Sequence, residues 1–432
     1  MRGAVACALV LAASLACRTA LAGDPASTFS IGARAAALGG AGGALEEPAT
    51  AGFLNPAAAA LGSGFEVRLG YLFAHPLLEY NGQRIDMRDV HGLSLGLRIP
   101  LLDRIVGKSQ LRAAFGLGLH VPDRSIARVY LVEPDRPSFV MWEGPVHRIV
   151  VVPVLAIAAG SFVSIGAGVT LLADGSGDVS LDLGFEGSQT RTDAEVDLEL
   201  RLRAAPVVGV TLNPFPWITI AGGYSGELAM DIALDVRADI GAPGLAGTTE
   251  VAIRGTNDYT PPSAWAAVGI HPAGWIDVHL QAAYVMWHRA NPFHARIRML
   301  VDLGADPAVL GGIVPARELD DRWVLSAGIE GRIPLPLGCA LALRAGYQYR
   351  PTPIPDQTGW TSYVDSDVHL ASTGLGFSTP VARATRLRLD WAFQVQRLVP
   401  RSVAKDPDVF VVTGFRSEGW VLASMLEIGI AF

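Results

Sequence analysis

The chain ends in a stretch of alternating residues that reaches its last residue, Phe432. From 420 onwards one face carries Trp420, Leu422, Ser424, Leu426, Ile428, Ile430 and Phe432, and the other carries Val421, Ala423, Met425, Glu427, Gly429 and Ala431. A period of two residues fits a β-strand and no helix. A soluble sheet would leave such an apolar edge open to aggregation, whereas a closed barrel pairs it and presents the apolar face to lipid. The sequence therefore predicts a membrane β-barrel that closes through this strand.

The same alternation recurs along the chain, with apolar side chains on one face and charged ones on the other. It is clearest at 65–73, 196–203, 276–284 and 387–396. Short joints marked by Pro or Gly alternate with long ones, which is typical of bacterial barrels with short turns at one end and long loops at the other. Beyond the N-terminus no run of 18 apolar residues indicates a membrane-spanning helix. We expect an all-β fold, a transmembrane antiparallel barrel of about 14 strands spanning 64–432.

The N-terminus has the features of an export signal. Arg2 precedes an apolar run from Ala4 to Cys17, and Ala20-Leu21-Ala22 resembles a signal-peptidase site. We therefore expect residues 1–22 to be a signal peptide and the protein to reside in the bacterial outer membrane. Cys17 leaves a lipoprotein open as an alternative. A net charge of −7 argues against nucleic acid as a partner.

Residues 23–63 do not fit the strand pattern. The stretch 32–57 is rich in Gly and Ala, and Pro48 and Pro56 break any continuous helix. The glycines at 39–43 follow no strand, so they fail the context that a phosphate-binding loop requires. We expect these residues to form a compact N-terminal hatch inside the barrel.

Two blocks carry a resemblance to a known family. They are 32–41 followed by Asn55-Pro56-Ala57, and 343–347 followed by 353–356 and 365–367. Together they resemble the outer-membrane channels of the FadL and TodX type. The resemblance implies passive, hatch-gated uptake of hydrophobic molecules, either long-chain fatty acids or hydrocarbons. It also implies a gate formed by Phe53, Leu54, Asn55, Pro56 and Ala57.

The resemblance also implies sideways release through a gap in the third strand, matched here by Gly116, Gly118 and Pro122. Gly leaves the wall without side-chain cover, and Pro cannot donate a ladder hydrogen bond. The sequence departs from the family at Asp123-Arg124, where an aromatic residue and Gly are usual.

Candidate cargo contacts come from two outer loops that are unusually apolar, 120–148 and 287–322. They supply Trp142, Trp287 and Phe293, and Arg344 on an inward face offers a guanidinium to a carboxylate. The alternatives are that the loops pack on each other and that inward arginines pair with inward acids such as Asp390 or Glu427. His279 and His369 stand without the neighbours of a metal motif, so we expect no metal and no cofactor.

Three classes of function remain. A channel for hydrophobic molecules is favoured, and a barrel that anchors or shuttles a secretion or assembly system is the alternative. An enzyme is not expected, because Ser94 and His91 lie on opposite faces of one strand. Expected partners are hydrophobic small molecules, outer-membrane lipid and lipopolysaccharide, and the barrel assembly machinery, with the protein acting as a monomer.

Overall fold

The structure is a computed structural model of the whole chain. It describes residues 20–21, 25–106, 109–123, 138–143, 149–186, 189–242, 245–290, 294–302, 308–314, 319–356, 358, 363–382, 384–406 and 414–432. Only the backbone is described for 173–201, 230–258, 294–302 and 308–314. The predicted signal peptide lies almost wholly outside these residues, apart from a two-residue strand, β1 (Ala20–Leu21).

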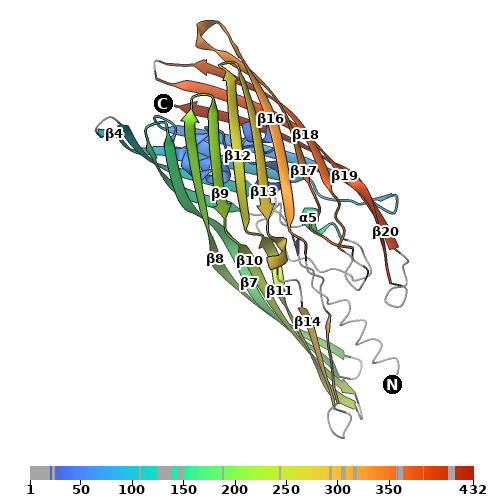
Figure 1. Cartoon of the computed structure of the whole chain (residues 1–432). Coiled ribbons are helices and arrows are strands. Elements are labelled where there is room, and N and C mark those ends of the chain that lie inside the picture. The colour runs from blue at the N-terminus through green and yellow to red at the C-terminus, as the bar shows by residue number, and fades with distance from the viewer. Residues whose placement is uncertain are drawn as a thin grey trace.

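Fourteen antiparallel strands of the described chain form a closed barrel (Figure 1). β2 pairs with β4 on one side and with β20 on the other, so the first and last strands close the ring as predicted. In order around the wall the strands are β2 (Glu66–Tyr80), β4 (Val90–Val106), β5 (Ser109–Pro122), β6 (Val150–Ala159), β7 (Val163–Glu186), β8 (Gln189–Phe215), β9 (Ile218–Ser225), β12 (Ser263–Ala273), β13 (Ile276–Val285), β16 (Arg322–Pro334), β17 (Ala340–Arg350), β18 (Val368–Pro380), β19 (Arg386–Ala404) and β20 (Gly414–Ala431). The fold class and the strand number predicted from the sequence are confirmed.

The alternation places apolar side chains outside and polar ones inside. Leu69 of β2 and Leu426 of β20 are 50% and 52% exposed, whereas Arg68 and Glu427, one position away on each strand, are buried. Large apolar residues are exposed on strands all around the wall. The barrel therefore has an apolar outer surface and a charged interior, the reverse of a soluble protein.

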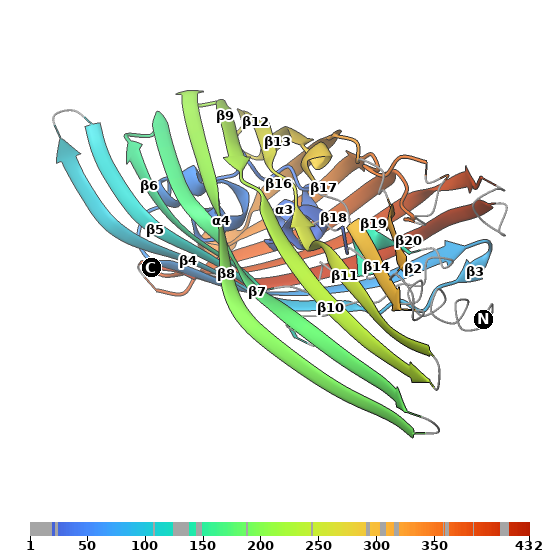
Figure 2. The same ribbon diagram turned by 90° about the horizontal axis from the view of Figure 1, so that it is seen from below.

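The two ends of the barrel differ in their connections. One end has tight turns, such as Gly160–Phe162 between β6 and β7 and Pro216–Trp217 between β8 and β9. At the other end β7 and β8 continue past the wall as a paired hairpin, and the outer part of β7 pairs in parallel with β10 (Leu228–Ala242), which begins a four-strand extension of the sheet (Figure 2). The extension contains β10, β11 (Leu245–Thr260), β14 (His294–Asp302) and β15 (Ala308–Val314).

Part of the predicted loop 287–322 is therefore regular structure. After η4 (Trp287–Arg289), β14 pairs with β11 and β15. The sequence leaves the segments near 179–185 and 230–257 open between loop hairpins and strand extensions. Residues 179–185 are an extension of β7, whereas 230–257 lie in the hairpin formed by β10 and β11. A short strand, β3 (Gln83–Arg84), and a helix, α5 (Val140–Glu143), complete the long-loop end.

Residues 25–64, here called the N-terminal segment, lie within the ring of strands (Figures 1 and 2). The segment folds into short helices: α2 (Pro25–Phe29), α3 (Ala33–Ala37), η1 (Pro48–Thr50), α4 (Ala51–Leu54) and η2 (Pro56–Ala60). Most of its residues are buried. No helix of the described chain is long and apolar enough to cross a membrane.

Glycines let the segment approach the wall closely. A Cβ added to Gly346 of β17 would lie 2.2 Å from the backbone nitrogen of Gly39, and one added to Gly166 of β7 would lie 2.3 Å from the backbone of Pro56. Contacts under 3.0 Å are not tolerated by real Cβ atoms, so these wall positions require Gly.

Candidate functional site

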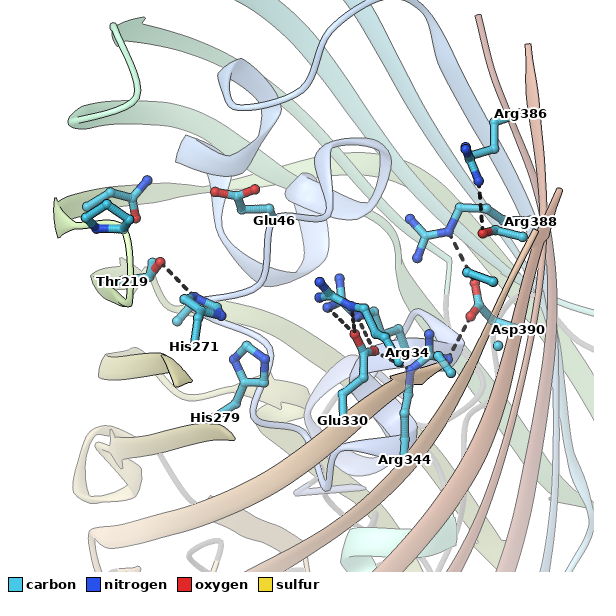
Figure 3. Close-up of a pocket in the computed structure, with 18 of the residues that line it drawn as sticks. Arg34, Glu46, Thr219, His271, His279, Glu330, Arg344, Arg386, Arg388 and Asp390 are labelled. Carbon is cyan, nitrogen blue, oxygen red and sulfur yellow. Dashed lines mark hydrogen bonds and ion pairs between the residues drawn. The ribbon is translucent and has the colours of Figure 1, made fainter. Parts of the chain in front are cut away.

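Ion pairs join the N-terminal segment to the barrel wall (Figure 3). Arg34 of α3 donates through Nε and Nη2 to both carboxylate oxygens of Glu330 on β16, at 2.7 and 2.8 Å. Its Nη1 donates to Glu47 of the same segment at 2.7 Å. All three side chains are buried. A two-point guanidinium–carboxylate contact fixes orientation as well as distance, so this pair holds α3 in one place against β16.

The pairing continues across the wall through neighbouring strands. Glu47 also meets Arg68 of β2 at 2.7 Å, and Arg68 meets Glu427 of β20 at 2.8 Å. Burial opposes ionisation of Glu47, but Arg388, Arg68 and Arg34 outweigh it and hold the pKa of this carboxyl well below its usual range. Glu47 is therefore the charged centre at which the segment meets the wall.

Arg344 belongs to the same set of ion pairs. Its Nε donates to Glu330 at 2.6 Å and its Nη1 donates to Asp390 of β19 at 2.7 Å. A guanidinium engaged on two sides is not free to bind a carboxylate of cargo without losing these partners. The surroundings of Arg344 match the alternative given above, in which inward arginines pair with inward acids. Binding of cargo by Arg344 stays a prediction.

The N-terminal segment contributes residues to two cavities. The inner cavity, at the end with the tight turns, measures about 820 Å³ and includes Arg34 and Glu46 of the segment together with Arg332, Arg386 and Arg388 of the wall. The outer cavity, toward the long-loop end, measures about 210 Å³ and includes Phe53 and Leu54 of the segment. The inner cavity is rich in charged groups, and the outer cavity mixes apolar and polar ones.

Two aromatic side chains and two arginines give the outer cavity its character. Trp265 and Trp287 line it together with Arg322 of β16 and Arg350 of β17. Trp287 is fully buried, and Arg322 lies over its ring at 5.5 Å from the centroid. The predicted cargo residue Trp287 thus faces a cavity, whereas Phe293 lies outside the described residues.

Arg322 and Arg350 are buried cations that the sequence reasoning missed. Arg322 donates to the carbonyl of Pro351 at 2.9 Å, and Arg350 donates to Gln396 at 2.9 Å and to the carbonyl of Thr28 at 3.3 Å. Within the described chain neither has a carboxylate at salt-bridge distance, and the Nε of Arg322 has no hydrogen-bond partner. Asp365, in the loop between β17 and β18, adjoins both, and burial raises the pKa of its carboxyl. The outer cavity is therefore bordered by positive charge without a fully matched acid.

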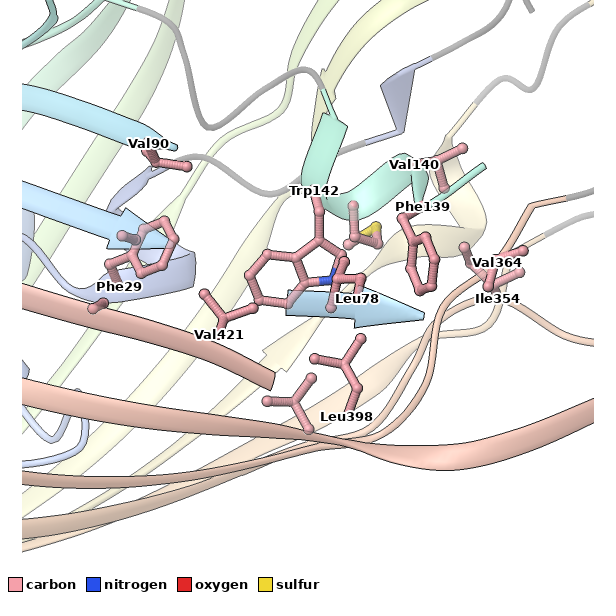
Figure 4. Packing of buried hydrophobic residues seen from close by; sticks show 14 of the residues in the cluster. Phe29, Leu78, Val90, Phe139, Val140, Trp142, Ile354, Val364, Leu398 and Val421 are labelled. Atoms are coloured by element: carbon pink, nitrogen blue, oxygen red, sulfur yellow. The ribbon is translucent and has the colours of Figure 1, made fainter. Parts of the chain in front are cut away.

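Trp142 lies in an apolar cluster at the long-loop end (Figure 4). It is buried, its ring is 6.4 Å from that of Phe29, and Arg350 lies 5.6 Å from its ring centroid. The cluster also includes Trp287 and residues of the N-terminal segment, of α5, β2, β19 and β20, and of the loop after β17. Trp142 is therefore packed as expected if the long loops pack on each other. It also borders a small space of about 10 Å³ next to Arg322 and Arg350.

The five residues predicted as a gate span the end of α4, the linking residue Asn55 and the start of η2. The side chain of Asn55 donates to the carbonyl of Gly43 and to the hydroxyl of Thr211 on β8, both at 2.8 Å, and accepts from the amide of Ala57 at 3.1 Å. Pro56 begins η2. Asn55 therefore caps a helix and ties the segment to the wall at the same time, while Phe53 and Leu54 face the outer cavity.

The predicted sideways gap falls on β5, the third barrel strand. Gly116 and Gly118 are paired to β4 and to β6 without a break, from Leu111 to His120 on the β6 side. A Cβ on Gly118 would lie 2.9 Å from the ring of Phe53, and one on Gly116 would lie 3.4 Å from Ala59. These glycines thus make room for the N-terminal segment. Release at this point stays a prediction.

The surface and interior together define the class of protein. Trp217 and Trp275 are exposed at the tight-turn end, and Trp323 and Trp420 are exposed at the long-loop end, as in the two aromatic girdles of a membrane barrel. A closed antiparallel wall satisfies every strand edge, which is the requirement for spanning lipid with strands. The chain is a transmembrane β-barrel of the bacterial outer-membrane type.

Solved structures with the same fold narrow the class. A FadL homologue of Pseudomonas aeruginosa is 15% identical, with a TM-score of 0.54, over 91% of this chain and 96% of that chain. The CymD monoaromatic hydrocarbon channel is 14% identical, with a TM-score of 0.50, over 93% and 97%. A deletion mutant of the TodX monoaromatic hydrocarbon channel is 14% identical, with a TM-score of 0.50, over 94% and 99%. At these identities the likeness establishes a fold of the FadL and TodX type over nearly the full chain.

No protein-family model matches the sequence, and no curated protein matches it.

Proposed function

We propose that this chain is an outer-membrane channel for the passive uptake of hydrophobic molecules. The observation that carries the proposal is the pair of cavities to which the N-terminal segment contributes, an outer one lined by aromatic side chains and an inner one lined by charges. Two of the solved structures with the same fold are monoaromatic hydrocarbon channels. The expected partners are hydrophobic molecules, outer-membrane lipid and lipopolysaccharide, and the barrel assembly machinery, with the protein as a monomer. No chemical step is required.

The outer cavity favours an amphipathic cargo with an acid group. Burial contributes about 25 cal/mol for each Å² of apolar surface, or roughly 0.8 kcal/mol per methylene, so an acyl chain gains affinity from Trp265, Trp287 and Phe53. An anionic headgroup would supply the carboxylate that neither Arg322 nor Arg350 has at salt-bridge distance within the described residues. A long-chain fatty acid meets both requirements, whereas a neutral hydrocarbon meets only the first.

The N-terminal segment would act as the hatch of this channel. It contributes to both cavities, and the ion pairs of Arg34 and Glu47 hold it to the wall. Cargo can shift the segment only if it binds the shifted state better than the docked state. An anionic cargo that binds Arg322 and Arg350 would supply such a preference. In the docked state Arg350 donates to the backbone of α2, and a cargo carboxylate would compete for those hydrogen bonds.

Release near the third strand would follow from movement of the same segment. Phe53 and Ala59 fill the space over Gly118 and Gly116. Their withdrawal would uncover a stretch of β5 that has no side chains of its own on that face. Opening of an exit in β5 would then depend on movement of the hatch. Pro122 lies at the end of β5, away from the contacts of Phe53 and Ala59.

The test is uptake of labelled oleate by cells that lack their own fatty-acid channel. Gel mobility shifts on heating must first show that each barrel is folded. We expect the intact protein to support uptake, the double variant Arg322→Met and Arg350→Met to lose most of it, and Arg416→Met, which alters an exposed ion pair, to retain it.

The two substitutions also separate the cargo classes. Toluene uptake that survives both substitutions while oleate uptake falls would support the headgroup assignment. A folded wild-type barrel that transports neither compound would refute the channel and favour a barrel that anchors or shuttles a secretion or assembly system.

A further inference from the structure

Two histidines face each other on the wall of the inner cavity, and neither belongs to the ion pairs described above (Figure 3). His271 lies near the end of β12 and His279 lies on β13, directly across the ladder from Gly269. Their ring centroids are 6.0 Å apart and their planes are nearly perpendicular, at 71°. Because a tight turn joins β12 and β13, His271 and His279 lie side by side although they are eight positions apart in the sequence.

His279 is a polar side chain without polar contacts. It is 1% exposed, and neither of its ring nitrogens has a hydrogen-bond partner within the described residues. An unsatisfied buried polar group costs about 1 to 3 kcal/mol, so such a group calls for an explanation. Its position on a cavity wall leaves room for a ligand.

His271 is oriented by its neighbours. Its Nδ1 lies 2.6 Å from Oδ1 of Asp277, which places the proton on Nδ1 and makes Nε2 the acceptor. Nε2 accepts from the hydroxyl of Thr219 at 3.3 Å, a long hydrogen bond that a metal ion would replace. A carboxylate behind an imidazole is the arrangement that orients metal-binding histidines and raises their basicity.

The missing Cβ of Gly269 leaves a space between the two rings. A Cβ there would lie 3.3 Å from Nδ1 of His279 and 3.4 Å from Nε2 of His271. Two imidazole nitrogens at about 2.0 to 2.1 Å from one metal place their ring centroids roughly 5 to 6.5 Å apart, a range that includes the observed separation. Both nitrogens therefore border the same small space, above a residue that has no side chain.

We propose that His271 and His279 form a transition-metal site that opens into the inner cavity. Imidazole ligands favour Cu²⁺, Zn²⁺ and Ni²⁺, and Cu²⁺ binds most tightly of the three. No group of three or more metal-binding side chains occurs in the described chain, so two protein ligands hold the ion and water completes its coordination. The charged groups beside the site are already paired: Asp277 pairs with Arg332, and Glu330 pairs with Arg332, Arg34 and Arg344. The site is independent of the channel proposal.

The experiment is a titration of the untagged, detergent-purified barrel with Cu²⁺, followed by electron paramagnetic resonance and calorimetry. The expected result is one bound ion with two nitrogen ligands. His271→Ala and His279→Ala should each leave one nitrogen in the spectrum and lower the affinity by more than about 10- to 100-fold, the loss that follows removal of an outer-shell partner alone. His288→Ala, which changes a histidine bonded to Asp321 at the other end of the barrel, should bind as the wild type does.

Gly269→Ala gives a second test that keeps both ligands. Its methyl group would occupy the space between the nitrogens, so we expect a loss of affinity similar to that of the histidine variants. No binding by the folded wild type at micromolar Cu²⁺ would overturn the proposal. Full affinity in both histidine variants, or in Gly269→Ala, would also overturn it, because the ion would then lie elsewhere.

Discussion

Removing the side chain charge of Arg34 tests whether ion pairs hold the N-terminal segment in place. Arg34→Met keeps the apolar stem and deletes the contacts to Glu330 and Glu47. Loss of one partner from a buried pair costs about 3 to 5 kcal/mol. Glu330 keeps Arg344 and Glu47 keeps Arg68, so the lower end of that range applies. At 1.4 kcal/mol per factor of ten, about 3 kcal/mol changes the docking equilibrium roughly 100-fold.

The readout is ion conductance of single barrels in planar bilayers. A docked segment narrows the path, so the time-averaged conductance of Arg34→Met should rise, and protease should cut within 25–64 faster than in the wild type. Arg416→Met removes an exposed pair with Glu418 and should change neither. A folded Arg34→Met barrel with wild-type conductance and wild-type cleavage would refute the assignment of these ion pairs as the hold on the segment.

Three further outcomes follow from the same geometry. Gly346→Val should displace the N-terminal segment and raise conductance, because its side chain would clash with the backbone at Gly39. Gly331→Val should leave conductance unchanged, because no atom lies within 4 Å of its Cβ position. Equal effects of the two substitutions would contradict the close-contact argument. The pKa of Glu47 is held below its usual range, so its stabilising contribution is complete above that range and is lost only as the pH falls through the lowered value. Conductance should therefore be unchanged between pH 7 and pH 4, and a rise across that interval would count against the charged state of Glu47. Trp142→Ala should lower the free energy of local unfolding of α5 by about 3 to 5 kcal/mol. Amide exchange in 138–143 should then be faster, with exchange in β20 unaltered. An unaltered exchange rate in α5 would show that the Trp142 ring does not stabilise this helix.

The inside and outside of the barrel were predictable because a two-residue period leaves no choice of face. Leu69, Leu426 and Leu389 are exposed and Arg68, Glu427 and Asp390 are buried, as alternation requires. Closure through β2 and β20 followed from an apolar last strand that needs a partner. The pairing of β10 with β7, and of β14 with β11, could not be predicted, because the sequence specifies which residues form strands but not which distant strands meet.

The candidate site was predictable only in part. Trp287 was expected to face cargo and lines the outer cavity, but Arg322 and Arg350 were overlooked because each stands at a strand end, where alternation no longer assigns a face. The proximity of His271 and His279 has a signal in the sequence, since the two histidines lie on either side of a Pro-Ala-Gly stretch that predicts a tight turn. The partners of Arg344 depend on three strands at once, so no local pattern reveals them.

The contacts of the N-terminal segment impose an order on assembly. Arg34 meets β16, Asn55 meets β8, and the amide of Ala33 reaches Glu427 of β20 across a separation of 394 residues. Such separations delay formation, because the intervening chain must be brought together first. The ring cannot close around the segment until β20 is present to pair with β2, and a segment that arrives after closure would have to thread through an end of the barrel. Enclosure of these residues without threading therefore requires that the segment be in place when β20 pairs with β2.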